Sequence, residues 1–203
     1  MQQRNVAILI FDDAEVLDFC GPFEVFSVTG KRDDSNPFNV YLVAEKTPVL
    51  ARGGFSINPH YTLDNCPPPD ILVVPGGGGY KADGTPLGTR REMHNEKLIA
   101  WIAGLFPQNE LVLSVCTGAF LIAKAGLADG LAATTHHKVF DVLREMAPHT
   151  DVREDERIVD NGKIVFSGGI SAGIDASFHV VARLLGKEVA RETASYMEYD
   201  WRE

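Results

Sequence analysis

The chain has 203 residues, of which 45% are hydrophobic and 23% are charged; these values are ordinary for globular proteins and exclude disorder, collagen and coiled coil. Its 28 acidic and 19 basic side chains give a net charge of −9, which disfavours a nucleic-acid partner because the phosphates would be repelled. No run of the sequence approaches the ~20 apolar residues of a membrane span, and residues 6–11 are too short a run for the core of a signal peptide.

Short runs rich in Val, Ile and Leu alternate along the chain with longer segments of helical periodicity. The runs are almost continuously apolar, which is typical of strands buried on both faces. The predicted strands are residues 6–11, 38–44, 71–74 and 111–115, and the predicted helices are residues 22–29 (opening at Pro22), 91–105 and 117–125. This alternation predicts an α/β fold with a mostly parallel central sheet and helices on both faces, that is, a three-layer sandwich.

Two hairpin signals interrupt the alternation. Arg52-Gly53-Gly54 lies between the short runs 49–50 and 55–57, and Asn161-Gly162 joins residues 157–159 to 163–166. From Ser171 onward the pattern predicts two helices separated at Gly186. No repeat or linker divides the sequence, so we expect one domain over residues 1–203.

Cys116 is the strongest chemical signal in the sequence. It follows the apolar run 111–115 and precedes Thr117-Gly118 and an apolar helix, and this strand, turn and helix predict a nucleophile elbow. A helix N-terminus beside the sulfur would lower the pKa of the thiol and favour the thiolate. The alternative is a buried cysteine that serves as a small apolar side chain.

Two further features are expected at the same edge of the sheet. Gly76 and Gly77 follow the strand 71–74, where their backbone N–H groups could hold a developing anion, although a flexible loop is the alternative. Asp18 stands among apolar neighbours ahead of Pro22, a setting that raises the pKa of a carboxyl and suits proton donation. A turn aspartate bound to nearby N–H groups is the competing interpretation.

The cysteines and histidines give no metal-binding pattern. Cys20, Cys66 and Cys116 form an odd, scattered set without Cys-x-x-Cys spacing, which predicts free thiols, a cytoplasmic setting and neither disulfide nor metal. His136 is a candidate base for Cys116, or a surface histidine. Because His136 and His137 are adjacent, their rings are expected to diverge.

Five short blocks, taken in order, resemble the ThiJ/PfpI superfamily, which has the fold of the class I glutamine amidotransferases. The resemblance extends from about Val6 to Tyr199. The blocks are residues 17–22 (LDFCGP), 75–77 (PGG), 114–119 (SVCTGA), 133–136 (ATTH) and 168–175 (GGISAGID). Within the superfamily they are most similar to isocyanide hydratase and to the sensing domains of AraC-type regulators.

The resemblance implies a role for each matched residue. The nucleophile falls on Cys116 and the acid on Asp18, and the oxyanion donors would be N–H groups around Gly76, Gly77 and Thr117, with His136 beside the substrate. The elbow Cys116-Thr117-Gly118 differs from the Cys-His-Gly of the peptidase-like members, so peptidase activity is not expected.

Three functions follow from this resemblance. The first is a cofactor-independent hydratase that converts an isocyanide, or a similar small electrophile, to an N-formamide through a thioimidate on Cys116. The second is hydration of an α-oxoaldehyde, as in a glyoxalase. The third is a ligand- or redox-sensing domain without catalysis. The sequence ends at Glu203, so no DNA-binding segment of about a hundred residues is expected, and the superfamily implies a homodimer.

Overall fold

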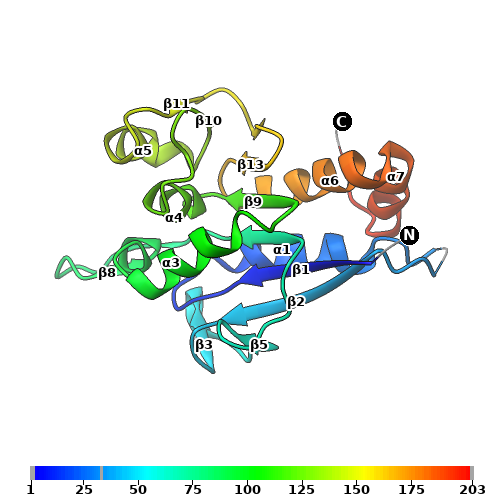
Figure 1. Ribbon diagram of the computed structural model, residues 1–203, viewed down its shortest axis with the longest axis horizontal. Helices are drawn as coiled ribbons and strands as arrows, with labels where there is room; N and C mark the ends of the chain where they lie inside the picture. The colour runs from blue at the N-terminus through cyan, green and yellow to red at the C-terminus, as the bar shows by residue number, and fades with distance from the viewer. Residues whose placement is uncertain (1–2, 33, 202–203) are drawn as a thin grey trace.

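A central β-sheet organises the computed structural model, which describes residues 3–32 and 34–201 (Figure 1). Across the sheet the strands follow the order β12 (Ile158–Asp160), β13 (Ile164–Ser167), β9 (Leu111–Val115), β6 (Ile71–Val74), β1 (Arg4–Leu9), β2 (Phe38–Ala44) and β5 (Tyr61–Thr62). Neighbouring strands are parallel except β12 and β13, which are antiparallel. The predicted α/β fold with a mostly parallel sheet is confirmed.

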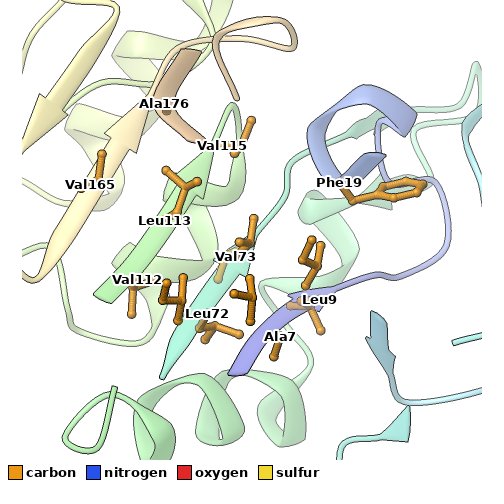
Figure 2. Close-up of a cluster of buried hydrophobic side chains, with 14 of the residues drawn as sticks. Ala7, Leu9, Phe19, Leu72, Val73, Val112, Leu113, Val115, Val165 and Ala176 are labelled. Carbon is orange, nitrogen blue, oxygen red and sulfur yellow. The ribbon is translucent and has the colours of Figure 1, made fainter. Parts of the chain in front are cut away.

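Helices cover the sheet and close the hydrophobic core. Helices α1 (Val16–Val28) and α6 (Ala172–Leu185) pack against each other, and α7 (Lys187–Tyr196) packs on both of them. Helix α4 (Gly118–Lys124) contacts β6 and β9 and also α3 (Glu96–Leu105) and α5 (Phe140–Met146). Figure 2 shows Phe19 of α1 and Ala176 of α6 in one hydrophobic cluster with Leu72 and Leu113 of the central strands, and all four side chains are buried. The central strands are apolar at most positions because both faces of the sheet are covered.

The strand predictions agree closely with the structure. The predicted strands 38–44, 71–74 and 111–115 have the same bounds as β2, β6 and β9, whereas β1 begins and ends two residues before the predicted strand 6–11. Both hairpins are present: β3 (Val49–Ala51) pairs with β4 (Phe55–Ile57), and β12 pairs with β13. The second hairpin turns at Gly162, where φ is 82° and the N–H donates to Asp160 Oδ1 at 2.7 Å. The two C-terminal helices separated at Gly186 are confirmed as well.

The prediction that the first helix opens at Pro22 is wrong. Helix α1 starts at Val16, and Pro22 lies inside it. A proline inside a helix removes one backbone hydrogen bond, but here the helix is fixed by packing. Phe19 is buried, and Gly21 approaches α6 so closely that an added Cβ would lie 2.8 Å from Ile174 Cγ1. As a result Asp18 lies in the first turn of α1 rather than in the loop before it.

The helix predicted over residues 91–105 is two helices, α2 (Thr89–Glu92) and α3. The Asn95 side chain accepts a hydrogen bond from Leu98 N at 3.2 Å and starts α3 as its N-cap, which interrupts the apolar periodicity. Ser171 occupies the N-cap position of α6, but its side chain makes no capping bond there. The sequence analysis missed a further hairpin, β7 (Gly78–Tyr80) with β8 (Pro86–Gly88), which is formed by the glycine-rich segment after β6.

Candidate active site

Four segments of the chain meet at one edge of the sheet. Cys116 follows β9, Gly76 follows β6, Ile170 follows β13, and Asp18 lies in the helix that follows β1. All of these strands end at the same edge because they are parallel, and that edge is where open α/β sheets bind ligands.

Cys116 sits on a strained turn that the surrounding backbone holds in place. Its φ is +57°, in the left-handed region that non-glycine residues rarely adopt. Its N–H donates to the carbonyl oxygens of Ser167 and Gly168 at 3.2 and 3.1 Å, and its own carbonyl accepts from Thr135 Oγ1 at 2.8 Å. Gly118 lets α4 approach β6, since an added Cβ would lie 2.2 Å from Val74 O. The sharp elbow predicted at Cys116 is therefore built by contacts on every side.

Asp18 is completely buried beside the elbow. Its Oδ2 accepts a hydrogen bond from the N–H of Gly76 at 2.9 Å, while its Oδ1 has no hydrogen-bond partner among the described residues. Gly76 is needed for this approach, because an added Cβ would lie 2.5 Å from Thr117 N and 3.0 Å from Asp18 Oδ2. The Gly76 N–H thus holds one oxygen of the carboxyl in place, and the other oxygen is left able to bind a further group.

Asp18 and Cys116 perturb each other's ionisation. Burial raises the pKa of the Asp18 carboxyl to about 7, far above its ordinary value of 3.8. Burial, with the Asp18 charge adding to it, raises the pKa of the Cys116 thiol to about 12. The expectation of a lowered thiol pKa is therefore wrong: backbone N–H groups of Ile170 and Thr117 do lower it, but desolvation outweighs them.

The amides that were expected to be free donors are already engaged within the protein. The N–H of Gly76 binds Asp18, and the N–H of Gly77 donates to Thr117 Oγ1 at 3.0 Å. Thr89 Oγ1 is 3.0 Å from both Thr117 Oγ1 and Gly77 O, which closes a buried network. These two glycines therefore position Asp18 and Thr117, and the amides that face the sulfur belong to Thr117 and Ile170.

Ile170 was not singled out from the sequence. Its φ is +53°, which is a marked outlier for a β-branched residue. It lies in the block 168–175, which sequence reasoning used for the family resemblance without giving Ile170 a role. The signal available was the glycine pair ahead of it, which precedes a turn that brings its N–H towards Cys116.

A pocket of about 330 Å³ opens over Cys116, a size suited to a small molecule. Its lining brings together Glu15, Arg52, Gly77, Gly78, Arg90, Cys116, Thr117, His136, Lys138, Val139 and Ile170. Of the predicted residues, Cys116, Thr117, Gly77 and His136 line it directly, and Gly76 and Asp18 lie just behind the elbow. Sequence reasoning did not assign Arg52, Arg90 and Lys138 to the site, and Arg52 was noted only as part of a hairpin signal.

His136 lines the pocket without a hydrogen bond to Cys116. Its Nδ1 accepts from Lys138 N at 3.3 Å, and burial lowers the pKa of the imidazole, which favours the neutral ring. The rings of His136 and His137 stack with centroids 4.4 Å apart, so the expectation that they diverge is wrong. A short 3₁₀ turn begins at His137 and bends the chain enough to bring the rings together.

Within residues 3–32 and 34–201, no group of three or more His, Cys, Asp or Glu side chains is placed to hold a metal ion. Over the same residues, none of the helices combines the length and the apolar character needed to cross a membrane.

The parallel sheet and the strained cysteine elbow define a class of α/β proteins in which one thiol is presented at the carboxyl edge of the sheet. Residues 4–183 match the model of the DJ-1/PfpI family. The chain belongs to this family.

Comparison with individual proteins supports the same assignment. The chain is 32% identical over 197 residues to an isonitrile hydratase of Pseudomonas putida, covering 96% of this chain and 78% of the relative. It is 30% identical over 149 residues to the HTH-type transcriptional regulator CdhR of Pseudomonas aeruginosa, covering 73% of this chain but 41% of the regulator. A ThiJ/PfpI family protein from Pseudomonas syringae superimposes with a TM-score of 0.85 at 26% identity, over 100% of this chain and 78% of that one.

Proposed function

We propose that the protein is a cysteine-dependent hydratase that adds water to an isocyanide, or to a similarly small electrophile, and releases an N-formamide. The observation that carries the proposal is the buried Asp18 carboxyl beside the Cys116 thiol at the base of a small pocket. The similarity to an isonitrile hydratase supports the same reaction.

The first step joins the sulfur to the terminal carbon of the isocyanide. Asp18, with a pKa of about 7, takes the thiol proton as the sulfur attacks and then gives that proton to the same carbon. The product is a thioimidate, in which a new C–S and a new C–H bond have formed. A group whose pKa lies near the working pH suits both halves of this transfer.

The second step adds water to the thioimidate. Asp18 is again in its ionised form and accepts a proton from the water, whose oxygen bonds to the carbon, and it passes this proton to the imine nitrogen. The C–S bond then breaks as the hydroxyl becomes a carbonyl, the hydroxyl proton goes to the sulfur, and the N-formamide leaves. The N–H groups of Thr117 and Ile170, which face the sulfur, stabilise the negative charge that develops on it during attack and again when the C–S bond breaks.

The experiment is an assay of N-formamide formation from methyl isocyanoacetate by mass spectrometry. Cys116→Ala should lower kcat/KM by at least about 10³-fold, and Asp18→Asn by about 10²–10⁴-fold, the range typical of a positioned acid or base. The matched control is Cys66→Ala, since Cys66 is half-buried and its thiol lies 3.9 Å from Leu63 O, outside the pocket. Wild-type turnover by Cys116→Ala would refute the assignment of the nucleophile.

A sensing role is the second candidate, and the similarity to transcriptional regulators favours it. The chain spans 41% of CdhR and 52% of GbdR, a second HTH-type transcriptional regulator of Pseudomonas aeruginosa that is 23% identical to it, so it covers about half the length of these relatives. In this case the pocket would bind a ligand, or a peroxide would oxidise the Cys116 thiol to sulfenic acid with release of water. Absence of turnover on isocyanides and on methylglyoxal, with ready oxidation at Cys116, would favour this candidate.

The proposal includes a homodimer and a reduced cytoplasmic setting. Size-exclusion chromatography with light scattering tests the first, because a monomer mass at micromolar concentration would contradict it.

A further inference from the structure

Arg90 places a positive charge in the pocket that no acidic side chain neutralises. Among residues 3–32 and 34–201, Arg90 forms no ion pair with a carboxylate. The neighbouring Arg91, in contrast, pairs with Asp13 and Glu92, both at 2.8 Å. Arg90 is half-buried, and this desolvation lowers the pKa of its guanidinium. A half-buried cation without a counter-ion favours an anion from outside the protein.

The guanidinium is mounted on the same framework as the elbow. Its Cζ lies 4.9 Å from the centre of the Phe120 ring in α4, and its Nη1 is 3.4 Å from Thr89 Oγ1. Thr89 in turn is bonded to Thr117 beside the nucleophile, and the Tyr80 hydroxyl and the Cys116 thiol also lie close enough to interact with Arg90. The positive charge is therefore held at a fixed place relative to Cys116.

The other charged groups of the pocket do not cancel this charge. Among the described residues that line the pocket, Glu15 is the one carboxylate, and Arg52 pairs with it at 2.5 Å; the Asp18 carboxyl lies behind the elbow and outside this lining. Lys138 contributes a further cation at the exposed rim, and His136 tends to be neutral. In a chain whose net charge is −9, the pocket lining thus carries an excess of positive charge.

We propose that Arg90 binds a carboxylate on the substrate, so that the pocket selects small electrophiles that carry a negative charge over neutral ones of the same size. This inference rests on the proposed function in one respect, the reaction at the electrophilic carbon. The recognition of the anion by Arg90 does not depend on that reaction. The competing role for Arg90 is to stabilise the Cys116 thiolate, which lies within range of its charge.

Alkylation of Cys116 separates these roles without requiring turnover. Iodoacetate and iodoacetamide are nearly the same size, and each forms a C–S bond with the thiolate and releases iodide, but only iodoacetate is charged. The rate constant at Cys116 is followed by mass spectrometry of its peptide, so that Cys20 and Cys66 do not contribute. We expect the iodoacetate-to-iodoacetamide ratio to fall at least about 10-fold in Arg90→Gln, the loss of one charge-assisted hydrogen bond.

Two variants serve as controls. Arg90→Lys keeps the charge and should keep most of the ratio. Arg4→Gln removes a positive charge at the amino end of β1, the opposite edge of the sheet, and should keep the wild-type ratio. An equal slowing of both reagents in Arg90→Gln would overturn the proposal, because it would mean that Arg90 acts only on the thiolate. An unchanged ratio would overturn it as well.

Turnover gives the second measurement. Wild type should prefer isocyanoacetate to its methyl ester by about 10-fold in kcat/KM, and Arg90→Gln should lose this preference mainly through KM. If neither isocyanide reacts while the alkylation ratio still depends on Arg90, the proposed hydratase function fails and the anion site stands. If both react equally well in the wild type, the anion site fails and the hydratase stands.

Discussion

Gly76→Ala tests whether the geometry of the elbow depends on one close contact. An added Cβ would lie 2.5 Å from Thr117 N, 2.6 Å from Thr117 Oγ1 and 3.0 Å from Asp18 Oδ2. The first of these is a backbone atom, so no change of side-chain rotamer relieves the overlap. The segment after β6 must move away from the elbow, and the Gly76 N–H that holds Asp18 must move with it.

The size of the effect follows from this overlap. Inserting a methyl group into a packed site costs about 1–3 kcal/mol, and for a protein of this length each kcal/mol lowers Tm by about 2–4 °C. A displacement approaching 1 Å at a catalytic group costs about 10²-fold in rate. We therefore expect a Tm about 5 °C lower and a kcat/KM for isocyanide hydration lower by about 10²-fold.

The measurements are thermal unfolding by circular dichroism and formamide production under initial-rate conditions. Gly104→Ala is the matched control, because Gly104 lies in α3 and an added Cβ there meets no atom within 4 Å. Alanine in a helix should stabilise this variant by about 0.5–1 kcal/mol and leave the rate unchanged. A Gly76→Ala protein with the wild-type Tm and the wild-type rate would refute the role assigned to this contact.

Three further predictions concern ionisation and helix capping. Folding raises the pKa of Asp18 from 3.8 to about 7, and each pKa unit corresponds to about 1.4 kcal/mol. The free energy of unfolding should therefore fall by about 4 kcal/mol as the pH rises through that interval. In urea unfolding, Asp18→Asn should lack this loss and exceed the wild type at pH 8 but not at pH 4; equal stability at both pH values would contradict the buried carboxyl. Removing the Asp18 charge should also lower the pKa of the Cys116 thiol, so iodoacetamide should modify Cys116 faster at pH 8 in this variant, and a slower reaction would contradict the coupling. Asn95→Ala should cost about 1 kcal/mol through loss of the N-cap of α3, whereas Ser171→Ala, which removes no capping bond, should cost less in the same unfolding assay.

The sequence by itself determined the sheet and the position of the elbow. A run such as residues 111–115, short, apolar at almost every position and rich in Val and Leu, is typical of a strand that is covered on both faces, and β9 has these bounds. A cysteine directly after that strand, followed by a glycine and an apolar helix, predicts a strand–turn–helix, and Cys116 has the positive φ of such a turn. These features are local, because backbone conformation and burial are encoded in neighbouring residues.

The tertiary structure decided the chemistry around the sulfur. The start of α1 depends on how Gly21 packs against α6, and this packing outweighs the proline signal in the sequence. The amide of Gly76 is engaged by a carboxylate 58 positions away in the chain, and the thiol pKa rises because distant elements exclude water from Cys116. Arg90 reaches the pocket from a segment without any motif. Desolvation, charge coupling and the choice of hydrogen-bond partner depend on atoms brought together only by folding, and no local pattern of residues encodes them.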